Sequence, residues 1–244
     1  MSRNLIYTHW MGNLPIDYSE YLLPSVIRYC NYLNCDFRMV NRPHPSLDAS
    51  LGPEFHKLPF LSDFANDYDK IVYMDPDIYV TTFALDIFGS FGDEDVSLYS
   101  EFSETVNSDP NTNYRWRKFK DALGLNETPA DSYWGNSGVL RVNTANIQPF
   151  IDTFINIVSK RDSLFPPVAK SARNYRRVMD NVEPWLTAAL VLSGVSVGEM
   201  DLRWNCSYAR RKQDKIDPYF LHFNGIHAHK RKISKDWYRK CYSL

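Results

Sequence analysis

The acidic pair Asp75 and Asp77 is the feature of this sequence that most directly suggests chemistry. The two residues are separated by Pro76 and follow the apolar run at residues 71–74. Two carboxylates this close repel each other unless a positive charge lies between them. A divalent cation meets that need, and hard oxygen ligands suit Mg²⁺ or Mn²⁺. The pair therefore predicts a metal site, and a metal held there could bind a diphosphate.

The residues around the pair predict a buried β-strand that ends at the two acids. Residues 71–74 are β-branched, aromatic or otherwise apolar, with charged residues on either side. Pro76 fixes its own φ and favours an extended Asp75. In extended backbone, residues i and i+2 share a face, so we expect both carboxylates to point into one crevice. Such strand ends are where open α/β sheets bind ligands.

Two other interpretations of the pair stay open. One is a surface turn, because Asp and Pro are common turn residues. The other is a phosphohydrolase strand in which Asp75 is the nucleophile. That pattern has Thr or Val at its fifth position, where this chain has Tyr79, and it usually lies near an N-terminus.

Two later segments place polar groups beside apolar strands. Gly135 and Gly138 bracket Asn136 and Ser137, and glycine lets a backbone approach a ligand closely. The amide of Asn136 can donate and accept at once, which suits a sugar hydroxyl. His222 ends another short apolar strand, with Gly225 three residues later.

The composition is that of a globular protein. The chain has 244 residues, 44% hydrophobic and 23% charged, which fits one large α/β domain or two small ones. Its net charge of −1 gives no sign of nucleic-acid binding. The four cysteines form no zinc pattern, which favours a reduced compartment. No long apolar stretch follows the N-terminus, so we expect a cytoplasmic protein without a signal peptide or transmembrane segment.

The elements that must position these residues can be predicted from hydrophobic periodicity. A strand at 4–8, a helix at 18–34 and a strand at 35–40 predict a parallel crossover unit. The other expected elements are a helix at 54–64, a strand at 96–99, a polar, loop-rich stretch at 101–128, a helix at 147–158, a helix that Pro184 enters and a strand at 195–200.

Three motifs together resemble a known family. The segment Asp-Tyr-Asp-Lys-Ile-Val-Tyr-Met-Asp-Pro-Asp at 67–77 resembles the DxD region of GT-A glycosyltransferases, especially the glycogenin and lipopolysaccharide galactosyltransferase type. Asn-Ser-Gly-Val-Leu at 136–140 resembles the family's Asn-Ala/Ser-Gly-Val-Leu, and His-Phe-Asn-Gly at 222–225 resembles its His-Phe/Tyr-x-Gly. The motifs occur in the family order, and the resemblance covers nearly the whole chain.

The resemblance implies an α/β fold of GT-A type. It implies a single domain at 1–244, a mostly parallel twisted sheet flanked by helices, with a nucleotide-binding half at 1–100 and an acceptor-binding half at 101–244. It also implies metal-dependent transfer from a nucleotide-sugar donor, a UDP-sugar by family expectation, to a hydroxyl acceptor on a glycan or glycoconjugate. The non-catalytic alternative is a carbohydrate- or nucleotide-sugar-binding protein on a degenerate GT-A fold.

The resemblance also implies a role for individual residues. The metal ligands would be Asp75, Asp77 and His222, with Asp75 also near the ribose or a metal-bound water. The donor-binding residues would be Thr8, His9, Trp10, Lys57, Asp75, Ser137, Gly138, Gly225 and Lys230. Lys230 is proposed because Ala228 occupies the place of the family's diphosphate-binding lysine.

The residues at the reacting centre would be Asn136, Asp180 and Glu183. The family's Asp-Gln-Asp stretch before this helix is not kept here, so Glu183 could be a base, a partner of the sugar or a helix cap. The segment Leu202-Arg203-Trp204-Asn205 resembles a family motif that we interpret as mostly structural, with Trp204 near the acceptor.

Overall fold

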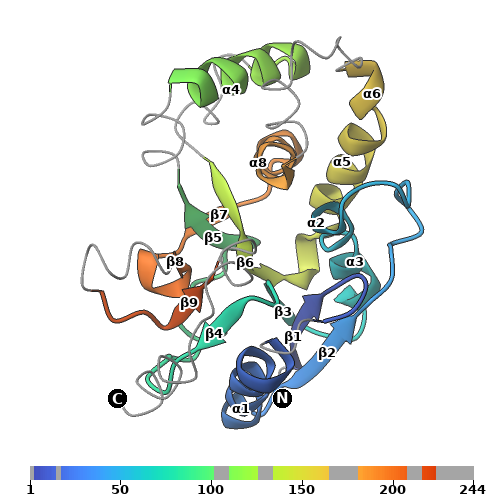
Figure 1. The fold of residues 1–244 in the computed structure, drawn as a ribbon. Helices are drawn as coiled ribbons and strands as arrows, with labels where there is room; N and C mark the ends of the chain where they lie inside the picture. Colours follow the sequence, from blue (N-terminus) through green and yellow to red (C-terminus); the bar gives the residue numbers. More distant parts are fainter. Residues whose placement is uncertain are drawn as a thin grey trace.

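The computed structural model describes residues 3–14, 18–101, 110–125, 134–164, 181–207 and 216–223. Its main feature is a six-stranded sheet in the order β2-β1-β3-β6-β5-β7 (Figure 1). The strands are β1 (Asn4–His9), β2 (Asp36–Val40), β3 (Lys70–Met74), β5 (Val96–Ser100), β6 (Gly135–Asn143) and β7 (Val197–Glu199).

One strand of this sheet runs against its neighbours. β1 pairs in parallel with β2 and β3, and β5 pairs in parallel with β7, but β6 is antiparallel to both β3 and β5. Because β6 is reversed, its first residues lie beside the last residue of β3: Met74 is opposite Val139, and the Asp75 N–H donates to the Gly138 carbonyl at 2.8 Å. The reversal therefore joins two of the motifs that the sequence singled out.

A second, smaller sheet brings in the third motif. It consists of β4 (Ile78–Val80), β9 (Phe220–His222) and β8 (Cys206–Ser207), in the order β4-β9-β8. β4 and β9 are antiparallel, with Ile78 opposite His222, and the Phe223 N–H donates to the Asp77 carbonyl at 3.1 Å. The sequence predicted neither this sheet nor the strand after Asp77, because three-residue strands carry almost no periodicity.

The helices lie near the positions predicted from the sequence, but several begin or end at different residues. They are α1 (Leu23–Leu33), α2 (Pro53–His56), α3 (Phe60–Ala65), α4 (Pro110–Leu123), α5 (Gln148–Ser159), α6 (Arg161–Leu164) and α8 (Val182–Ser193). Short turns are η1 (Tyr18–Leu22), a π-helix, and the 3₁₀ helices η4 (Thr144–Asn146) and η6 (Leu202–Trp204).

Two of those predictions need correction. The helix expected at 54–64 is divided into α2 and α3, and Pro59 lies at the start of α3 because proline has no N–H to continue a helix. The stretch at 101–128, expected to be loop-rich, contains the fourteen-residue helix α4. No helix in the described ranges is long and apolar enough to cross a bilayer.

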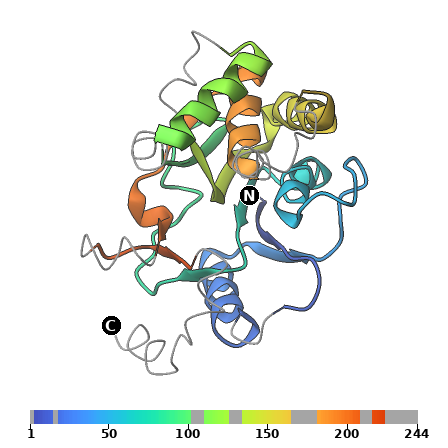
Figure 2. The same ribbon diagram turned by 45° about the horizontal axis from the view of Figure 1, so that its top comes forward.

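The four central strands of the large sheet are buried on both faces, whereas the edge strands β2 and β7 are partly exposed. Alternate residues of β1 and β3 face opposite sides: Tyr7 and Tyr73 belong to a core with α3, α5 and α8, whereas Ile6 and Val72 belong to a core with α1. Figures 1 and 2 show α1 on one side of the sheet and α4, α5 and α8 on the other. The strand ends between these layers carry the site described below.

Candidate active site

A cavity of about 700 Å³ opens where the two sheets meet the first turn of α8. Most of the predicted site residues that the structure describes line it: His9, Trp10, Lys57, Asp75, Asp77, Asn136, Ser137, Glu183 and His222. Thr8 and Gly138 are described but lie outside this lining. Asp180, Gly225 and Lys230 lie outside the described residues.

The three predicted metal ligands come together at one end of the cavity. One ligand atom each from Asp75, Asp77 and His222 lies within 4.8 Å of the other two. His222 Nε2 is 3.2 Å from Asp77 Oδ1 and 3.7 Å from Asp75 Oδ2. Asp77 and His222 are buried, whereas the Asp75 side chain is 22% exposed. This arrangement leaves the carboxylate of Asp75 open to the cavity.

The acids converge by a route that the sequence did not predict. We expected both carboxylates to point into one crevice, and both line the cavity. The extended backbone given as the reason is wrong, because the Ile78 N–H donates to the Asp75 carbonyl at 3.1 Å, which closes a turn. The turn reverses into β4, and the pairing of β4 with β9 then places His222 beside Asp77. Cross-strand pairing, rather than the i, i+2 spacing, creates the cluster.

The electrostatics of the cluster favour a cation. Burial alone would lower the pKa of His222, but the neighbouring carboxylates of Asp77 and Asp75 outweigh it, and the pKa is raised. Two carboxylates and an imidazole are a donor set that Mn²⁺ accepts, and the oxygens suit Mg²⁺. The residues present therefore fit the divalent metal that the sequence predicted.

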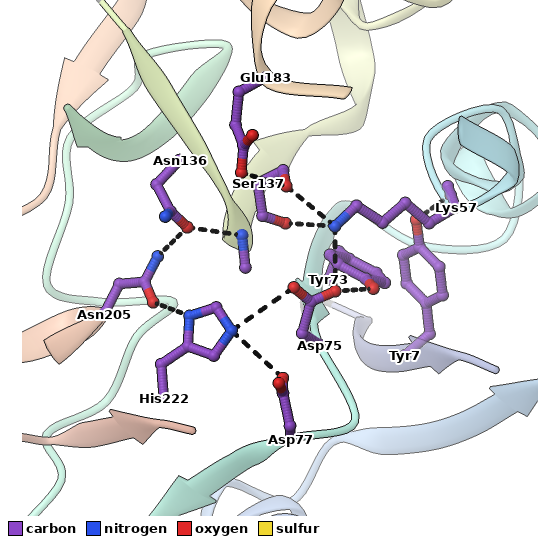
Figure 3. Close-up of polar contacts among 11 residues, drawn as sticks. Tyr7, Lys57, Tyr73, Asp75, Asp77, Asn136, Ser137, Glu183, Asn205 and His222 are labelled. Carbon is purple, nitrogen blue, oxygen red and sulfur yellow. Dashed lines mark hydrogen bonds and ion pairs between the residues drawn. The ribbon is translucent and has the colours of Figure 1, made fainter. Parts of the chain in front are cut away.

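Lys57 is a buried ion-pair partner rather than a surface lysine. Its side chain is 3% exposed, and its ammonium donates to Asp75 Oδ1 at 2.9 Å, to the Ser137 carbonyl at 2.9 Å and to Ser137 Oγ at 3.1 Å. Those contacts use all three donors of an ammonium. The Tyr73 hydroxyl also donates to Asp75 Oδ1. Lys57 and Tyr73 together hold one oxygen of Asp75, and the other faces His222 (Figure 3).

Glu183 lies across the cavity in the first turn of α8. Asn181 occupies the N-cap position, so Glu183 is not the cap that the sequence left open as an alternative. Its Oε1 accepts a long hydrogen bond from Ser137 Oγ at 3.4 Å, and its buried Oε2 has no hydrogen-bond partner in the described part of the chain. Burial raises the pKa of Glu183 to about 7, against the opposing effect of Lys57. This carboxyl group can therefore exchange a proton near neutral pH.

The amide of Asn136 is engaged within the protein. Its Nδ2 donates to Glu101 Oε1 at 2.8 Å, and its Oδ1 accepts from the Gly138 N–H at 2.8 Å and from Asn205 Nδ2. Asn205 in turn contacts the ring of His222. Reasoning from the sequence missed Tyr73, Glu101 and Asn205 as members of the site, although the family-like segment at 202–205 was a signal for the last.

Trp204, which we expected near the acceptor, is a core residue. It is 3% exposed and packs against the rings of Phe91, Tyr219 and Phe220. It does not line the cavity. The segment therefore contributes to the site through Asn205.

The far end of the cavity is aromatic. Trp10 lies edge-on to Tyr18 with ring centroids 5.4 Å apart, and both residues line the cavity. The Nε2 of His9 lies 3.0 Å from the carbonyl oxygen of Arg42, so this nitrogen carries the proton. Thr8, the preceding residue of β1, is 4% exposed, and its hydroxyl has no hydrogen-bond partner within the described ranges.

Comparison with known proteins gives a fold but no sequence relative. No protein-family model and no curated protein sequence matches the chain. Solved structures do match it, among them three at probability 1.00 over nearly its whole length. One is a glycosyltransferase involved in the glycosylation of the major capsid of PBCV-1, at 14% identity over 99% of this chain and 100% of that one, with a TM-score of 0.54.

The other two are WbbM, described as a bifunctional glycosyltransferase, and LgtC, described in another solved structure as a galactosyltransferase. The bifunctional glycosyltransferase WbbM matches at 13% identity over 99% of this chain and 51% of that one, with a TM-score of 0.60. An active-site mutant of LgtC matches at 12% identity over 98% of this chain and 95% of that one, with a TM-score of 0.57. At these identities the likeness concerns the fold, and the fold of this chain is that of GT-A glycosyltransferases.

Proposed function

We propose that this chain is a metal-dependent glycosyltransferase. It would transfer a sugar from a nucleotide-sugar donor, a UDP-sugar by expectation, to a hydroxyl group on a glycan or glycoconjugate. The observation that carries the proposal is the cluster of Asp75, Asp77 and His222 at a large cavity of a GT-A fold. Lys57 pairs with one oxygen of Asp75, and the other oxygen of Asp75, the carboxylate of Asp77 and the Nε2 of His222 are the donor set that a divalent cation would bind.

The residues around the cluster divide into holding and positioning groups. Asp75, Asp77 and His222 would hold Mn²⁺ or Mg²⁺, which when bound neutralises the diphosphate leaving group as a Lewis acid. Lys57 orients Asp75 through its ion pair of 2.9 Å. Asp75 would also contact the ribose or a metal-bound water from its exposed side.

The donor would extend from the cluster along the cavity. His9 and Trp10 are proposed to contact the nucleotide base, with Thr8 next to them in β1, because they lie at the end of that strand and at the aromatic end of the cavity. Lys57, Ser137 and Gly138 would support the donor sugar. Gly225 and Lys230 stay predictions for the diphosphate, since they lie outside the described residues.

Glu183 is our candidate for the group that acts at the reacting centre. Its pKa of about 7 lets a fraction of the molecules hold the carboxylate at neutral pH, which is what a general base requires. If transfer inverts the anomeric centre, Glu183 would remove the proton of the acceptor hydroxyl. Asp180 is the second candidate, and Asn136 is proposed to support the same centre.

The environment of the protein is part of the proposal. The four cysteines form no zinc pattern, and the reduced compartment expected from the sequence is the basis of this part of the proposal. We therefore propose a cytoplasmic enzyme that acts on soluble nucleotide sugar.

The alternatives receive less support. A phosphohydrolase with Asp75 as nucleophile is expected on a different fold from the one found here. A binding protein on the same fold would bind a nucleotide sugar without turnover. Release of nucleoside diphosphate in the presence of a glycan acceptor distinguishes the binding protein from the transferase.

The decisive experiment is a thermal-shift series with nucleoside diphosphates and nucleotide sugars, in Mn²⁺ and in chelator. A ligand that binds only the folded protein raises the melting temperature by mass action. We expect one nucleotide to raise it in Mn²⁺ but not in chelator, and the Asp77→Ala variant to lose the shift. A shift that survives chelation and Asp77→Ala would contradict the metal assignment, and no shift with any nucleotide would contradict the donor site.

A further inference from the structure

A chain of hydrogen bonds behind the metal cluster ends on the ring of His222. We propose that Asn136 and Asn205 are positioning residues: they fix the proton of the His222 ring on Nδ1 and so keep the Nε2 lone pair for the cation. The inference rests on the metal site of the proposed function. Figure 3 shows the chain running from Asn136 through Asn205 to His222.

The direction of the hydrogen bonds of Asn136 is fixed by neighbouring groups that can only donate or only accept. The Gly138 N–H can only donate, so the Asn136 atom that it meets at 2.8 Å must be the oxygen. The side chain of Glu101 lies 2.8 Å from the other end of the amide, and a carboxylate there accepts from the amide nitrogen. Both neighbours require the same orientation of the Asn136 amide.

That orientation determines the next amide. The Oδ1 of Asn136 also meets the side chain of Asn205, and an oxygen requires a donor, so Asn205 presents its Nδ2 there. The opposite end of the same amide is then an oxygen, and it lies 2.9 Å from His222 Nδ1. An oxygen acceptor at that distance requires a proton on Nδ1.

With the proton on Nδ1, the Nε2 of His222 keeps its lone pair in the neutral ring. Nε2 faces Asp77 Oδ1 at 3.2 Å, and without the chain a neutral imidazole could donate an Nε2 proton to that carboxylate. A proton there would occupy the lone pair that a metal needs. Partners of this kind set the tautomer and orientation of metal-binding histidines. Asn136 and Asn205 are 6% and 2% exposed, so water is a poor substitute for either amide.

The test has two readouts. The first is ¹⁵N NMR of histidine-labelled, metal-free protein at pH 9, with the His222→Gln variant to identify one signal among the six histidines. We expect wild-type His222 to carry its proton on Nδ1, and Asn205→Leu to move it toward Nε2. Asn205→Asp keeps an acceptor opposite Nδ1 and should retain the wild-type tautomer.

The second readout is Mn²⁺ affinity, measured from the EPR signal of free Mn²⁺ with UDP present. Loss of such a partner typically weakens metal binding by about 10- to 100-fold, which we expect for Asn205→Leu. The matched control is Asn143→Leu, which removes an amide contact to the Glu94 carbonyl at the other end of β6 and should keep wild-type affinity.

The outcomes separate this inference from the proposed function. A wild-type His222 with its proton on Nε2 would overturn the inference, even if Asn205→Leu does not fold. Wild-type Mn²⁺ affinity in folded Asn205→Leu would overturn it while leaving the metal site intact. Absence of Mn²⁺ binding in the wild-type protein would overturn the metal site itself, and the NMR result would still decide the tautomer.

Discussion

The two sides of the cavity are built differently. On the metal side, the Lys57 ammonium uses three acceptors, and both ring nitrogens of His222 face a polar partner. On the opposite side, Glu183 has one hydrogen bond of 3.4 Å and an oxygen without a partner in the described ranges. Buried polar atoms are nearly always satisfied, so an exception calls for a reason.

The difference suggests a division of labour. Groups that hold a cation are preorganised. If they were mobile, ordering them on binding would cost free energy and weaken the affinity for the cation. A group that must exchange a proton needs a pKa near the working pH, which burial without full hydrogen bonding provides. Substrate would then complete the contacts of Glu183.

The largest expected effect is on the metal side. Asp77→Asn removes one charge from the cluster while keeping its shape, and we expect transfer to fall by about 10³-fold or more, about 4 kcal/mol in the barrier. Turnover of the donor in Mn²⁺ measures it. The control Asp152→Asn, on α5 and exposed, should retain activity. Equal activity of the two variants would contradict the assignment of Asp77.

The next largest effect should be on the free energy of unfolding, when the ion pair between Lys57 and Asp75 is removed. Lys57→Met leaves Asp75 without its cation, and breaking a buried pair costs about 3–5 kcal/mol. Because Asp75 is 22% exposed to the cavity, we expect about 2–3 kcal/mol, measured by urea unfolding.

The exposed Lys160, at the end of α5, provides the comparison for this variant. Lys160→Met should change the free energy of unfolding by less than about 0.5 kcal/mol. If Lys57→Met were as stable as Lys160→Met, the metal side would not depend on the ion pair.

Gly138 tests how closely the metal side is packed. A methyl group at this position would lie 2.5 Å from Cε1 and 2.7 Å from Nδ1 of His222, so the ring would have to move. We expect Gly138→Ala to weaken Mn²⁺ binding by about tenfold, or about 1.4 kcal/mol, by EPR titration. Gly198→Ala in β7 introduces crowding at Glu94 and Ser97, away from the metal cluster, and should leave Mn²⁺ binding unchanged.

The smallest expected effect concerns the Glu183 side and depends on pH. Because the folded-state pKa is about 7 and the ordinary value 4.5, the folded protein binds the extra proton between these values and loses stability as pH rises through them. The glutamine of Glu183→Gln cannot ionise. Its free energy of unfolding should therefore exceed that of the wild type by about 1–2 kcal/mol at pH 8, after allowance for partial exposure, and the two should be equal near pH 4.

Paired urea unfolding of the wild type and Glu183→Gln at pH 4 and pH 8 measures that difference. If the difference in free energy of unfolding between the two proteins were the same at pH 4 and pH 8, Glu183 would not have a raised pKa. The contrast drawn between the two sides of the cavity would then be wrong. Donor turnover by the same variant adds a second reading, since a general base that cannot ionise should lose rate at pH 8.

Much of the metal side could be predicted from the sequence. Asp75 and Asp77 stand out because two acids follow an apolar strand, and His222 because its segment resembles a family motif. Lys57 was placed near the donor but not recognised as the partner of Asp75, since the ion pair joins residues separated by α3 and β3. Glu101 gave no local signal, because its contact to Asn136 joins residues far apart in the chain. Tyr73 was overlooked although it contacts Asp75, two residues further on.

The sequence by itself determined which residues could bind a metal and that the chain begins with a strand-helix-strand unit of an α/β protein. Residue type and local periodicity carry that information. Only the tertiary structure decided that β6 runs backwards between β3 and β5, that β9 pairs with β4, and that two buried amides orient His222. Those features depend on residues far apart in the chain, and hydrogen bonds between such residues form only once both sheets are packed.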